Sequence, residues 1–198
     1  HASLAPSEMC IRDRDSNIQS DFVQVDEDTR INVKLKSGQE TEINAPGPKV
    51  THAQFEQLLS QIRRTTNDDI VIVAGSVPNS IPSDAYAQIA QITEKTGAQL
   101  VVDAEKDLVE TVLPYRPLFI KPNKDELEVM FNTTVKSDED VIKYGKEILK
   151  KGAQSVIISL GGDGAIYVDQ HQSIKAVNPQ GHVVNTVGSL SLIHISER

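Results

Sequence analysis

Short apolar runs alternate along the chain with stretches whose apolar residues recur every three or four positions. An unbroken run such as IVIVA at 70–74 is typical of a strand that is covered on both faces of a sheet. Strands are predicted at 70–74, 99–103, 117–121 and 156–160. Strands that alternate with helices of about 10 to 15 residues indicate a mostly parallel, doubly wound α/β sheet with right-handed crossovers.

Helices are predicted between these strands from the spacing of the apolar residues and from their end signals. The first follows Thr51, a candidate N-cap, and is expected to bury Phe55, Leu58, Leu59 and Ile62. Further helices are predicted at 83–96, at 105–113, from Asn123 onward and at 138–151. In the last helix the inward residues are expected to be Val141, Tyr144, Ile148 and Leu149.

Residues 29–44 follow a two-residue period instead. Ile31, Val33 and Leu35 alternate with polar residues, and the turn signal Ser37-Gly38 follows them. This pattern predicts a β-hairpin with one solvated face, which does not belong to the parallel sheet. We expect the hairpin to act as a lid over the strand ends. A further antiparallel strand is predicted at 165–168, after a glycine-rich turn.

The charge balance is acidic, because 20 basic and 28 acidic side chains give a net charge of -8. Such a chain repels polyanions, so we expect neither a nucleic-acid partner nor a membrane partner. No apolar run approaches the roughly 18 residues that span a bilayer, and the N-terminus lacks a signal-peptide layout. A single cysteine, Cys10, cannot form an internal disulfide, which fits a reducing, cytoplasmic location.

Both ends of the chain differ in pattern from the middle. The stretches SEMCIRDR and SLSLIHISE resemble translated sequencing-adapter DNA, so residues 1–14 and 189–198 are expected to be non-native. Residues 15–188 are then the native segment, and it is cut on both sides. Ordinary ragged termini are the alternative, in which case Ile11 and Ile193 need a place to pack.

Ligands of open α/β sheets bind at the carboxyl ends of the parallel strands, so the residues after each strand are candidate site residues. Gly75 lets a ligand approach the backbone and Ser76 offers a hydroxyl, although a turn forced by Gly and Pro explains the same residues. Asn123 and Glu126 have the spacing of a helix capping box. The same helix N-terminus also favours a phosphate, beside which the acid can hold Mg²⁺.

A glycine-rich turn follows the strand at 156–160, with the sequence Ser159-Leu160-Gly161-Gly162-Asp163-Gly164. Its backbone N–H groups suit the phosphates or the base of a nucleotide, and a plain hairpin turn is the alternative. It is not a Walker loop, because no Lys-Ser/Thr follows. No GxGxxG opens a helix after a strand either, so a hydride-transfer enzyme loses its main support.

The predicted lid carries the basic residues Arg30 and Lys34. Taken alone, they are more readily explained as solvated charges on the wet face of the hairpin. If the hairpin covers a phosphorylated substrate, however, Arg30 is the natural bidentate partner for the phosphate.

The order of these motifs is more specific than any one of them. Read as TRINVKLKSG, TEINAPGP, AGSVP, KPNKDEL, SLGGDGA and VVNTVG, residues 17–188 resemble the phosphofructokinase-B family of ribokinase-like carbohydrate kinases. Within that family the segment most resembles the 1-phosphofructokinases, with tagatose-6-phosphate kinases and minor 6-phosphofructokinases as alternatives. The resemblance implies a ribokinase-like α/β fold with a small β lid, incomplete in this chain.

The resemblance also implies roles for individual residues. The positions that contact the sugar phosphate match Arg30, Asn32 and Ser76. The nucleotide positions match Lys121, Asn123, Ser159, Leu160, Gly161, Gly162, Asp163 and Gly164. Asn123 and Glu126 match the family's NxxE pair, which is associated with magnesium. ATP and Mg²⁺ are therefore the implied cofactors, and the parent protein is expected to form a homodimer through the lid.

The match ends before the family's catalytic base. In the family, NTVG continues into AGD, whose aspartate is the base, but here Asn185-Thr186-Val187-Gly188 runs into Ser189-Leu190. We therefore expect an inactive fragment of an enzyme that phosphorylates fructose 1-phosphate to fructose 1,6-bisphosphate with MgATP. A non-catalytic module that senses a sugar phosphate or a nucleotide is the alternative. A pure interaction protein is disfavoured by the ordered nucleotide motifs.

Overall fold

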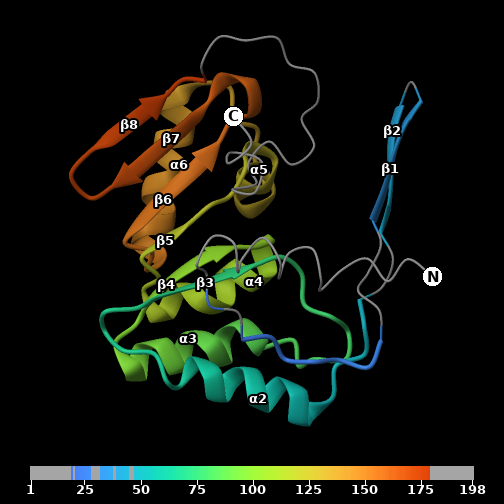
Figure 1. The fold of residues 1–198 in the computed structure, drawn as a ribbon. Helices are drawn as coiled ribbons and strands as arrows, with labels where there is room; N and C mark the ends of the chain where they lie inside the picture. The colour runs from blue at the N-terminus through green and yellow to red at the C-terminus, as the bar shows by residue number, and fades with distance from the viewer. Residues whose placement is uncertain (1–18, 20, 28–31, 38, 45–46, 179–198) are drawn as a thin grey trace.

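A six-stranded sheet lies at the centre of the computed structural model, which describes residues 19, 21–27, 32–37, 39–44 and 47–178 (Figure 1). Its strands are neighbours in chain order: β3 (Ile70–Ala74), β4 (Gln99–Asp103), β5 (Phe119–Ile120), β6 (Ser155–Ser159), β7 (Ala165–Asp169) and β8 (Ser173–Ala176). Strands β3 to β6 pair in parallel, and β7 and β8 follow antiparallel. The predicted mostly parallel α/β sheet is confirmed.

The helices lie between the strands in the order that the sequence predicts. They are α2 (His52–Ile62), α3 (Ala85–Thr96), α4 (Lys106–Val112), α5 (Lys124–Phe131) and α6 (Asp138–Lys151). Two 3₁₀ turns, η1 (Leu113–Tyr115) and η2 (Gly161–Asp163), follow α4 and β6. Helix α3 ends at Gly97, whose φ of 81° lies in the left-handed region that glycine adopts without steric cost.

Helix α2 begins with a capping box, in which the Thr51 hydroxyl accepts from the Gln54 N–H and the Gln54 side chain accepts from the Thr51 N–H. Its buried face consists of Phe55, Leu59 and Ile62. Leu58, predicted to join this face, is exposed, because it lies at the flank of the narrow stripe that the other three form. The prediction for α6 is confirmed: Val141 and Ile148 are buried, and Tyr144 and Leu149 pack against the core.

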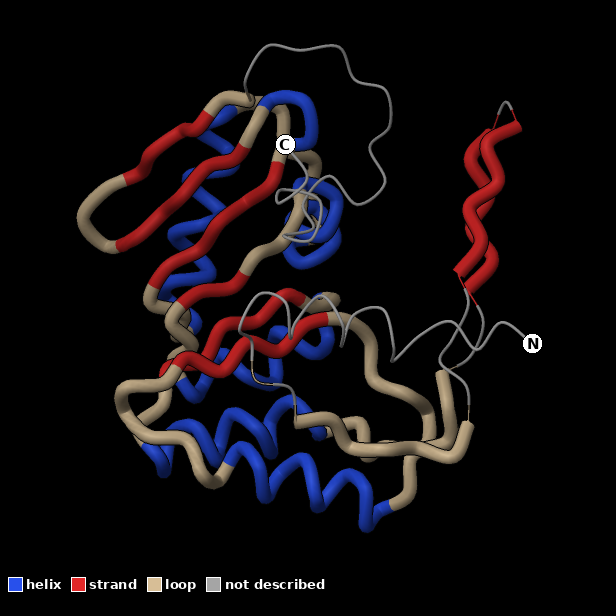
Figure 2. The backbone as a smooth tube through the Cα atoms, viewed as in Figure 1, coloured by secondary structure: helices blue, strands red, loops and turns tan. Residues whose placement is uncertain are grey.

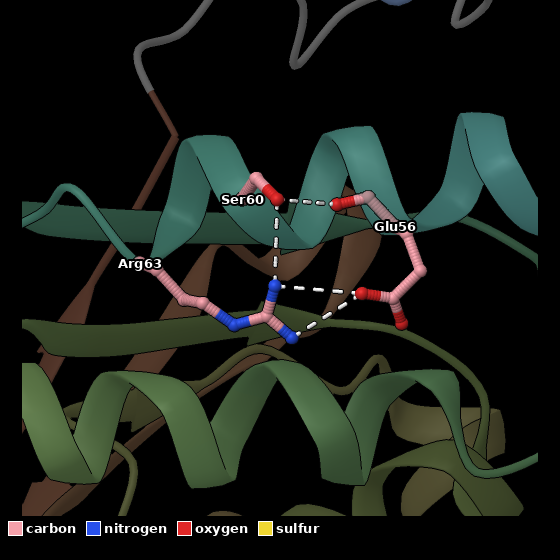
Figure 3. A network of polar contacts seen from close by, with 3 residues as sticks. All are labelled: Glu56, Ser60 and Arg63. Atoms are coloured by element: carbon pink, nitrogen blue, oxygen red, sulfur yellow. Dashed lines mark hydrogen bonds and ion pairs between the residues drawn. The ribbon is translucent and has the colours of Figure 1, made fainter.

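The outer side of α2 carries a small polar network (Figure 3). The Ser60 hydroxyl donates to the Glu56 carbonyl at 2.8 Å, and the Arg63 guanidinium reaches the Glu56 carboxylate at 3.4 Å. Arg63 also donates to the Ser60 hydroxyl at 3.4 Å. These side chains are exposed, so the network stabilises the surface of the helix only weakly.

The helices cover one face of the sheet. Figure 2 shows α2, α3 and α4 below β3 and β4, and α6 behind β6 to β8. The strand residues under this helical layer are buried: Leu100, Val102, Ile120, Val156, Ile158, Ile166 and Val168. They alternate along each strand with residues that point to the opposite face.

Strand β3 is not covered on both faces, contrary to the prediction. Val71 and Val73 pack against the core, whereas Ile70 and Ile72 are 58% and 70% exposed. The physical reason is that β3 is the edge strand of the sheet and that no described element covers the face to which these two isoleucines point. An apolar run in the sequence shows that both faces are apolar, but not that both are occupied.

Two strands differ from the prediction in extent. Strand β5 is only Phe119–Ile120, since Pro117 and Pro122 on either side have no N–H to donate to a ladder. Strand β8 (Ser173–Ala176) was not predicted, because its four residues are all exposed and no buried period marks it.

Strands β1 (Asn32–Ser37) and β2 (Gln39–Asn44) form the predicted hairpin as a separate two-stranded sheet. Their antiparallel register pairs Asn32 with Asn44 and Ser37 with Gln39. Figure 1 shows this hairpin apart from the large sheet, on the side to which β3 and β4 run. Among the described helices, none combines the length and apolarity that crossing a bilayer requires.

Candidate functional site

The carboxyl ends of the parallel strands are joined to one another by backbone hydrogen bonds. The Gly75 N–H donates to the Asp103 carbonyl at 3.0 Å and so links the end of β3 to the end of β4. The Ser159 N–H donates to the Pro122 carbonyl at 3.0 Å and links the end of β6 to the segment after β5. The residues after successive strands are therefore neighbours along the carboxyl-terminal end of the sheet. This end of the sheet is the candidate site.

An ion pair joins the ends of β4 and β5 at this end of the sheet. The Asp103 Oδ2 lies 3.1 Å from the Lys121 Nζ, and both side chains are partly exposed. The Lys121 N–H also donates to the Val102 carbonyl at 3.0 Å, which fixes the backbone of the lysine. The pair holds the ammonium group of Lys121 at the strand ends.

A buried tyrosine holds the turn after β3. The Tyr86 hydroxyl donates to the Gly75 carbonyl at 2.6 Å, and Ser76 follows directly as an exposed residue. Burial, and then the nearby negative charge of Asp103, raise the pKa of Tyr86 to about 12. The hydroxyl therefore stays protonated and keeps its role as a donor at neutral pH. The sequence reasoning missed Tyr86, because its only signal is an apolar position on a predicted helix.

Asn123 and Glu126 form the capping box that their spacing predicts. The Asn123 Oδ1 accepts from the Glu126 N–H at 2.8 Å, and the Glu126 Oε2 accepts from the Asn123 N–H at 2.7 Å. This box begins α5 and directs its N-terminal end toward the strand ends. Asn123 also forms a parallel bridge with Ser159, so the cap of α5 lies beside the glycine-rich turn.

The three glycines of the turn after β6 differ in whether the fold requires a glycine at their position. Gly164 has a φ of 92°, and a Cβ there would lie 2.0 Å from the Ala176 carbonyl oxygen, so the fold itself requires glycine. Gly161 has a φ of 59° and needs glycine for its backbone conformation only. A Cβ on Gly162 meets nothing within 4 Å, and its φ is not left-handed. The fold does not explain this third glycine.

The other residues of the turn take ordinary positions. Leu160 is partly buried against the core, and its N–H donates to the Gly164 carbonyl at 2.8 Å. Asp163 is exposed within η2. Asn178, which the sequence reasoning did not single out, donates from its side chain to the Gly161 carbonyl at 2.9 Å and steadies the turn.

Three predicted features of the site are not found among the described residues at the strand ends. Arg30 and the segment at 185–188 lie outside the described residues. Asn32 is the first residue of β1 and is paired with Asn44, on the hairpin and not at the strand ends. The structure therefore places Ser76, Lys121, Asn123, Glu126 and the turn at 159–164 after the carboxyl ends of neighbouring strands.

A cavity of about 460 Å³ lies elsewhere, at the amino ends of β5 and β6. Its lining includes Arg116, Ser155, Tyr167 and Asp169, and none of the predicted site residues. Asp169 accepts from the His171 N–H at 2.7 Å, and such backbone hydrogen bonds hold the pKa of Asp169 below its ordinary value. The carboxylate closes the turn between β7 and β8, which explains its place without a ligand.

The donor groups at the strand ends limit what kind of metal site is possible. Within the described part of the chain, no three His, Cys, Asp or Glu side chains are grouped as a protein-only metal site. Mg²⁺ that binds together with a nucleotide commonly needs only one or two carboxylates, because the phosphates supply the other oxygens. Glu126 at the cap of α5, Asp103 beside Lys121 and the exposed Asp163 of the glycine-rich turn are carboxylates at this end of the sheet.

The fold and the site together define a ribokinase-like α/β protein. The chain belongs to the pfkB family of carbohydrate kinases, whose family model matches residues 8–189. The resemblance on which the sequence reasoning depended is thereby confirmed.

Relatives of known name support the family. The chain is 40% identical over 176 residues to 1-phosphofructokinase of Bacillus subtilis, a match that spans 89% of this chain and 58% of the relative. It is 36% identical over 170 residues to D-tagatose-1-phosphate kinase of Bacillus licheniformis, spanning 85% of this chain and 56% of that protein. The chain thus spans less than two thirds of the length of these relatives.

A solved structure supports the fold. It is a crystal structure of a Staphylococcus aureus protein assigned provisionally as a phosphofructokinase, which is 78% identical to this chain with a TM-score of 0.77. The similarity covers 90% of this chain and 58% of that protein.

Proposed function

We propose that the protein to which this chain belongs transfers a phosphoryl group from MgATP to the 6-hydroxyl of fructose 1-phosphate. One observation carries the proposal: Ser76, Lys121, Asn123 and the turn at 159–164 follow the carboxyl ends of adjacent strands of one sheet. The 40% identity to a 1-phosphofructokinase supports this choice of substrate.

The glycine-rich turn is assigned to the nucleotide. Gly161 and Gly162 adjoin open space, and the fold does not require the missing side chain of Gly162. A ligand that approaches the backbone closely explains this residue. Lys121, held by Asp103, places a positive charge at the carboxyl ends of β4 and β5. Phosphoryl transfer depends mainly on such positioning and on charge stabilisation.

The cap of α5 is assigned to magnesium and to the phosphates. Its N-terminal N–H groups favour an anion, and the Glu126 carboxylate provides a ligand for the cation or for its water shell. Bound magnesium would neutralise charge on the phosphates. Asn123 contributes by keeping Glu126 in place through the capping box.

The sugar phosphate is assigned to Ser76 and to the hairpin residues Arg30 and Asn32. Ser76 lies at the end of β3, on a turn that Tyr86 holds through the Gly75 carbonyl. The hairpin is proposed to act as the lid and to join two copies of the whole protein, because a two-stranded sheet leaves two strand edges free to pair. The cytoplasm is the proposed location.

The chain itself is proposed to be an inactive fragment, native over 15–188. NTVG is followed by SLSL instead of the family's AGD, so the aspartate that serves as general base in the family is missing. A general base contributes roughly 10² to 10⁴ in rate. The loss of the base together with part of the sugar pocket leaves no useful turnover.

A second substrate has a specific observation in its favour. The relative from Bacillus licheniformis is a D-tagatose-1-phosphate kinase, and it is nearly as similar to this chain as the first relative. Tagatose 6-phosphate and fructose 6-phosphate are the other sugar phosphates to compare. A non-catalytic module that only binds these ligands is the competing function.

A chimeric enzyme tests the proposal. Residues 15–188 replace the matched region of the Staphylococcus aureus relative, which supplies the segments that this chain does not cover. We expect the chimera to release ADP in the presence of MgATP and fructose 1-phosphate, and the 198-residue chain alone to release none. A well-folded chimera without kinase activity overturns the catalytic proposal in favour of a binding module. Sugar-phosphate-dependent ADP release by the chain alone overturns its inactivity.

A further inference from the structure

The serine assigned to the sugar phosphate, Ser76, lies on an exposed turn that packing alone does not fix. Residues 75–80 belong to no helix or strand, and Ser76, Asn79 and Ser80 are exposed. Gly75 begins the turn with a φ of 89°, and a Cβ there would meet nothing within 4 Å. Because glycine adopts other φ values as readily, contacts from other elements have to hold this turn in one conformation.

Tyr86 on α3 holds the first end of the turn. It is only 4% exposed, and its hydroxyl donates to the Gly75 carbonyl at 2.6 Å. The peptide between Gly75 and Ser76 is planar and trans, so a carbonyl that points to Tyr86 turns the Ser76 N–H the opposite way. The buried phenol therefore sets the backbone orientation from which the Ser76 side chain projects.

Ser80 holds the other end of the turn. Its hydroxyl oxygen accepts from the Val50 N–H at 2.9 Å. Val50 lies between the hairpin and α2, where it packs against the core. The Ile81 N–H donates to the Pro78 carbonyl at 3.0 Å and closes the chain on itself beside Ser80. The two ends of the turn are thus held by hydroxyl groups that contact different parts of the fold.

We infer that Tyr86 and Ser80 are positioning residues for the sugar phosphate, because their hydroxyl groups hold the two ends of the turn that carries Ser76. The inference rests on the proposed function, in which Ser76 is assigned to that phosphate. Each hydroxyl acts on a backbone group of the chain and not on the substrate. A turn that is already ordered binds a ligand more tightly, since binding does not then have to order it.

The kinetic constants distinguish a positioning role from a purely structural one. The phosphate of fructose 1-phosphate is at the opposite end of the sugar from the 6-hydroxyl that reacts. A contact with this phosphate is the same in the bound substrate and in the transition state, so weakening it raises the KM and leaves kcat unchanged. A purely structural loss reduces the amount of folded enzyme, which lowers the apparent kcat and leaves the KM unchanged.

The test uses the chimeric enzyme that contains residues 15–188 of this chain. Tyr86→Phe and Ser80→Ala are each expected to raise the KM for fructose 1-phosphate about three- to tenfold, the range that one hydrogen bond contributes. The kcat and the KM for MgATP are expected to stay unchanged. Ser80→Thr keeps a hydroxyl and is expected to restore the KM for fructose 1-phosphate.

Two matched controls remove hydroxyl groups that lie away from the turn. Tyr144→Phe removes the phenol that contacts the Thr133 hydroxyl at 3.1 Å. Ser60→Ala removes the hydroxyl that donates to the Glu56 carbonyl at 2.8 Å on the outer side of α2. Both controls are expected to leave the KM for fructose 1-phosphate unchanged.

The outcomes separate this inference from the proposed function. A KM that rises for fructose 1-phosphate alone, in Tyr86→Phe and Ser80→Ala but in neither control, supports the inference. An active chimera whose KM for fructose 1-phosphate changes in neither variant overturns the inference and leaves the proposed function intact. Equal rises for both substrates overturn it as well, since they reflect general loosening of the fold.

Two further cases are decided by the same variants. If the chimera binds fructose 1-phosphate without turnover, the dissociation constant from calorimetry takes the place of the KM. A folded chimera that neither binds fructose 1-phosphate nor turns it over overturns the proposed function, and the inference with it. If Tyr86→Phe does not fold, the comparison of Ser80→Ala with Ser80→Thr decides the inference.

Discussion

The Asp103 carboxylate lies 3.1 Å from the Lys121 ammonium, across the ends of the adjacent strands β4 and β5. The two residues are far apart in the sequence and meet only because β4 and β5 pair in parallel with the register Val102 to Ile120. This pair places the positive charge on which the proposed nucleotide site depends.

Lys121→Met is expected to weaken MgATP binding by about tenfold or more, because a charge-assisted hydrogen bond contributes about 1.5 to 3 kcal/mol. Isothermal titration calorimetry of the chain measures the change. Lys150→Met is the control, since Lys150 pairs with Glu147 at 2.7 Å on the surface of α6, away from the strand ends. Equal losses in both variants would show that only general charge matters.

Tyr86 is expected to make the stability depend on alkaline pH. Its pKa is about 12 in the folded chain against an ordinary value of 10.0, so the folded state holds the proton more tightly. The stabilisation is complete below pH 10 and is lost as the pH rises toward 12, by up to about 2 to 3 kcal/mol. Urea unfolding at a series of pH values measures it.

Tyr86→Phe is expected to remove this pH dependence and to lower the stability near neutral pH by about 1 kcal/mol, through loss of the hydrogen bond to the Gly75 carbonyl. Tyr144→Phe, which removes a hydroxyl that contacts Thr133 at 3.1 Å, should leave the pH dependence in place. A Tyr86→Phe variant with an unchanged alkaline slope would disprove the assignment.

Glu126→Gln separates the capping role of Glu126 from its proposed magnesium role. The amide oxygen can still accept from the Asn123 N–H, so the unfolding free energy should change by less than about 0.5 kcal/mol. Magnesium-dependent ATP binding should nevertheless weaken several-fold, because the carboxylate charge is gone. Asp125→Asn removes an equal charge from the first turn of the same helix. If both variants lose the same affinity, the effect is that of the helix end and not of a metal ligand.

Gly162 and Gly164 should respond differently to the same substitution. Gly164→Ala is expected to destabilise the chain by more than about 2 kcal/mol, since its Cβ collides with the Ala176 carbonyl at a left-handed φ. Gly162→Ala should leave stability within about 0.5 kcal/mol but weaken ATP binding if the nucleotide lies against the backbone there. Thermal melts and calorimetry of both variants measure the contrast. Unchanged ATP affinity in Gly162→Ala would place the nucleotide elsewhere.

Much of the fold follows from the hydrophobic pattern, and the site follows from it less directly. The parallel strands and the helices were predicted because their apolar periods and caps are local signals, as at Thr51 and Asn123. The exposure of Ile72 was not predicted, because a strand sequence does not record which neighbours are present. The exposed strand β8 left no periodic signal at all.

The residues of the site also differ in how well the sequence predicts them. Asn123, Glu126 and the glycine-rich turn carry recognisable spacings, and the structure places them together. The partnership of Asp103 with Lys121 depends on strand register, and that of Tyr86 with the Gly75 carbonyl depends on packing. Neither relation has a fixed spacing that a sequence could show.

The antiparallel strands at the end of the sheet have a consequence for how the chain folds. β6, β7 and β8 follow one another through short connections, and α6, which directly precedes them, packs on β6 and β7. Contacts between near neighbours in the sequence form quickly, whereas the pairing of β3 with β4 must first close a loop that contains α3. We therefore expect this C-terminal meander to become structured during folding before the half of the sheet that contains β3.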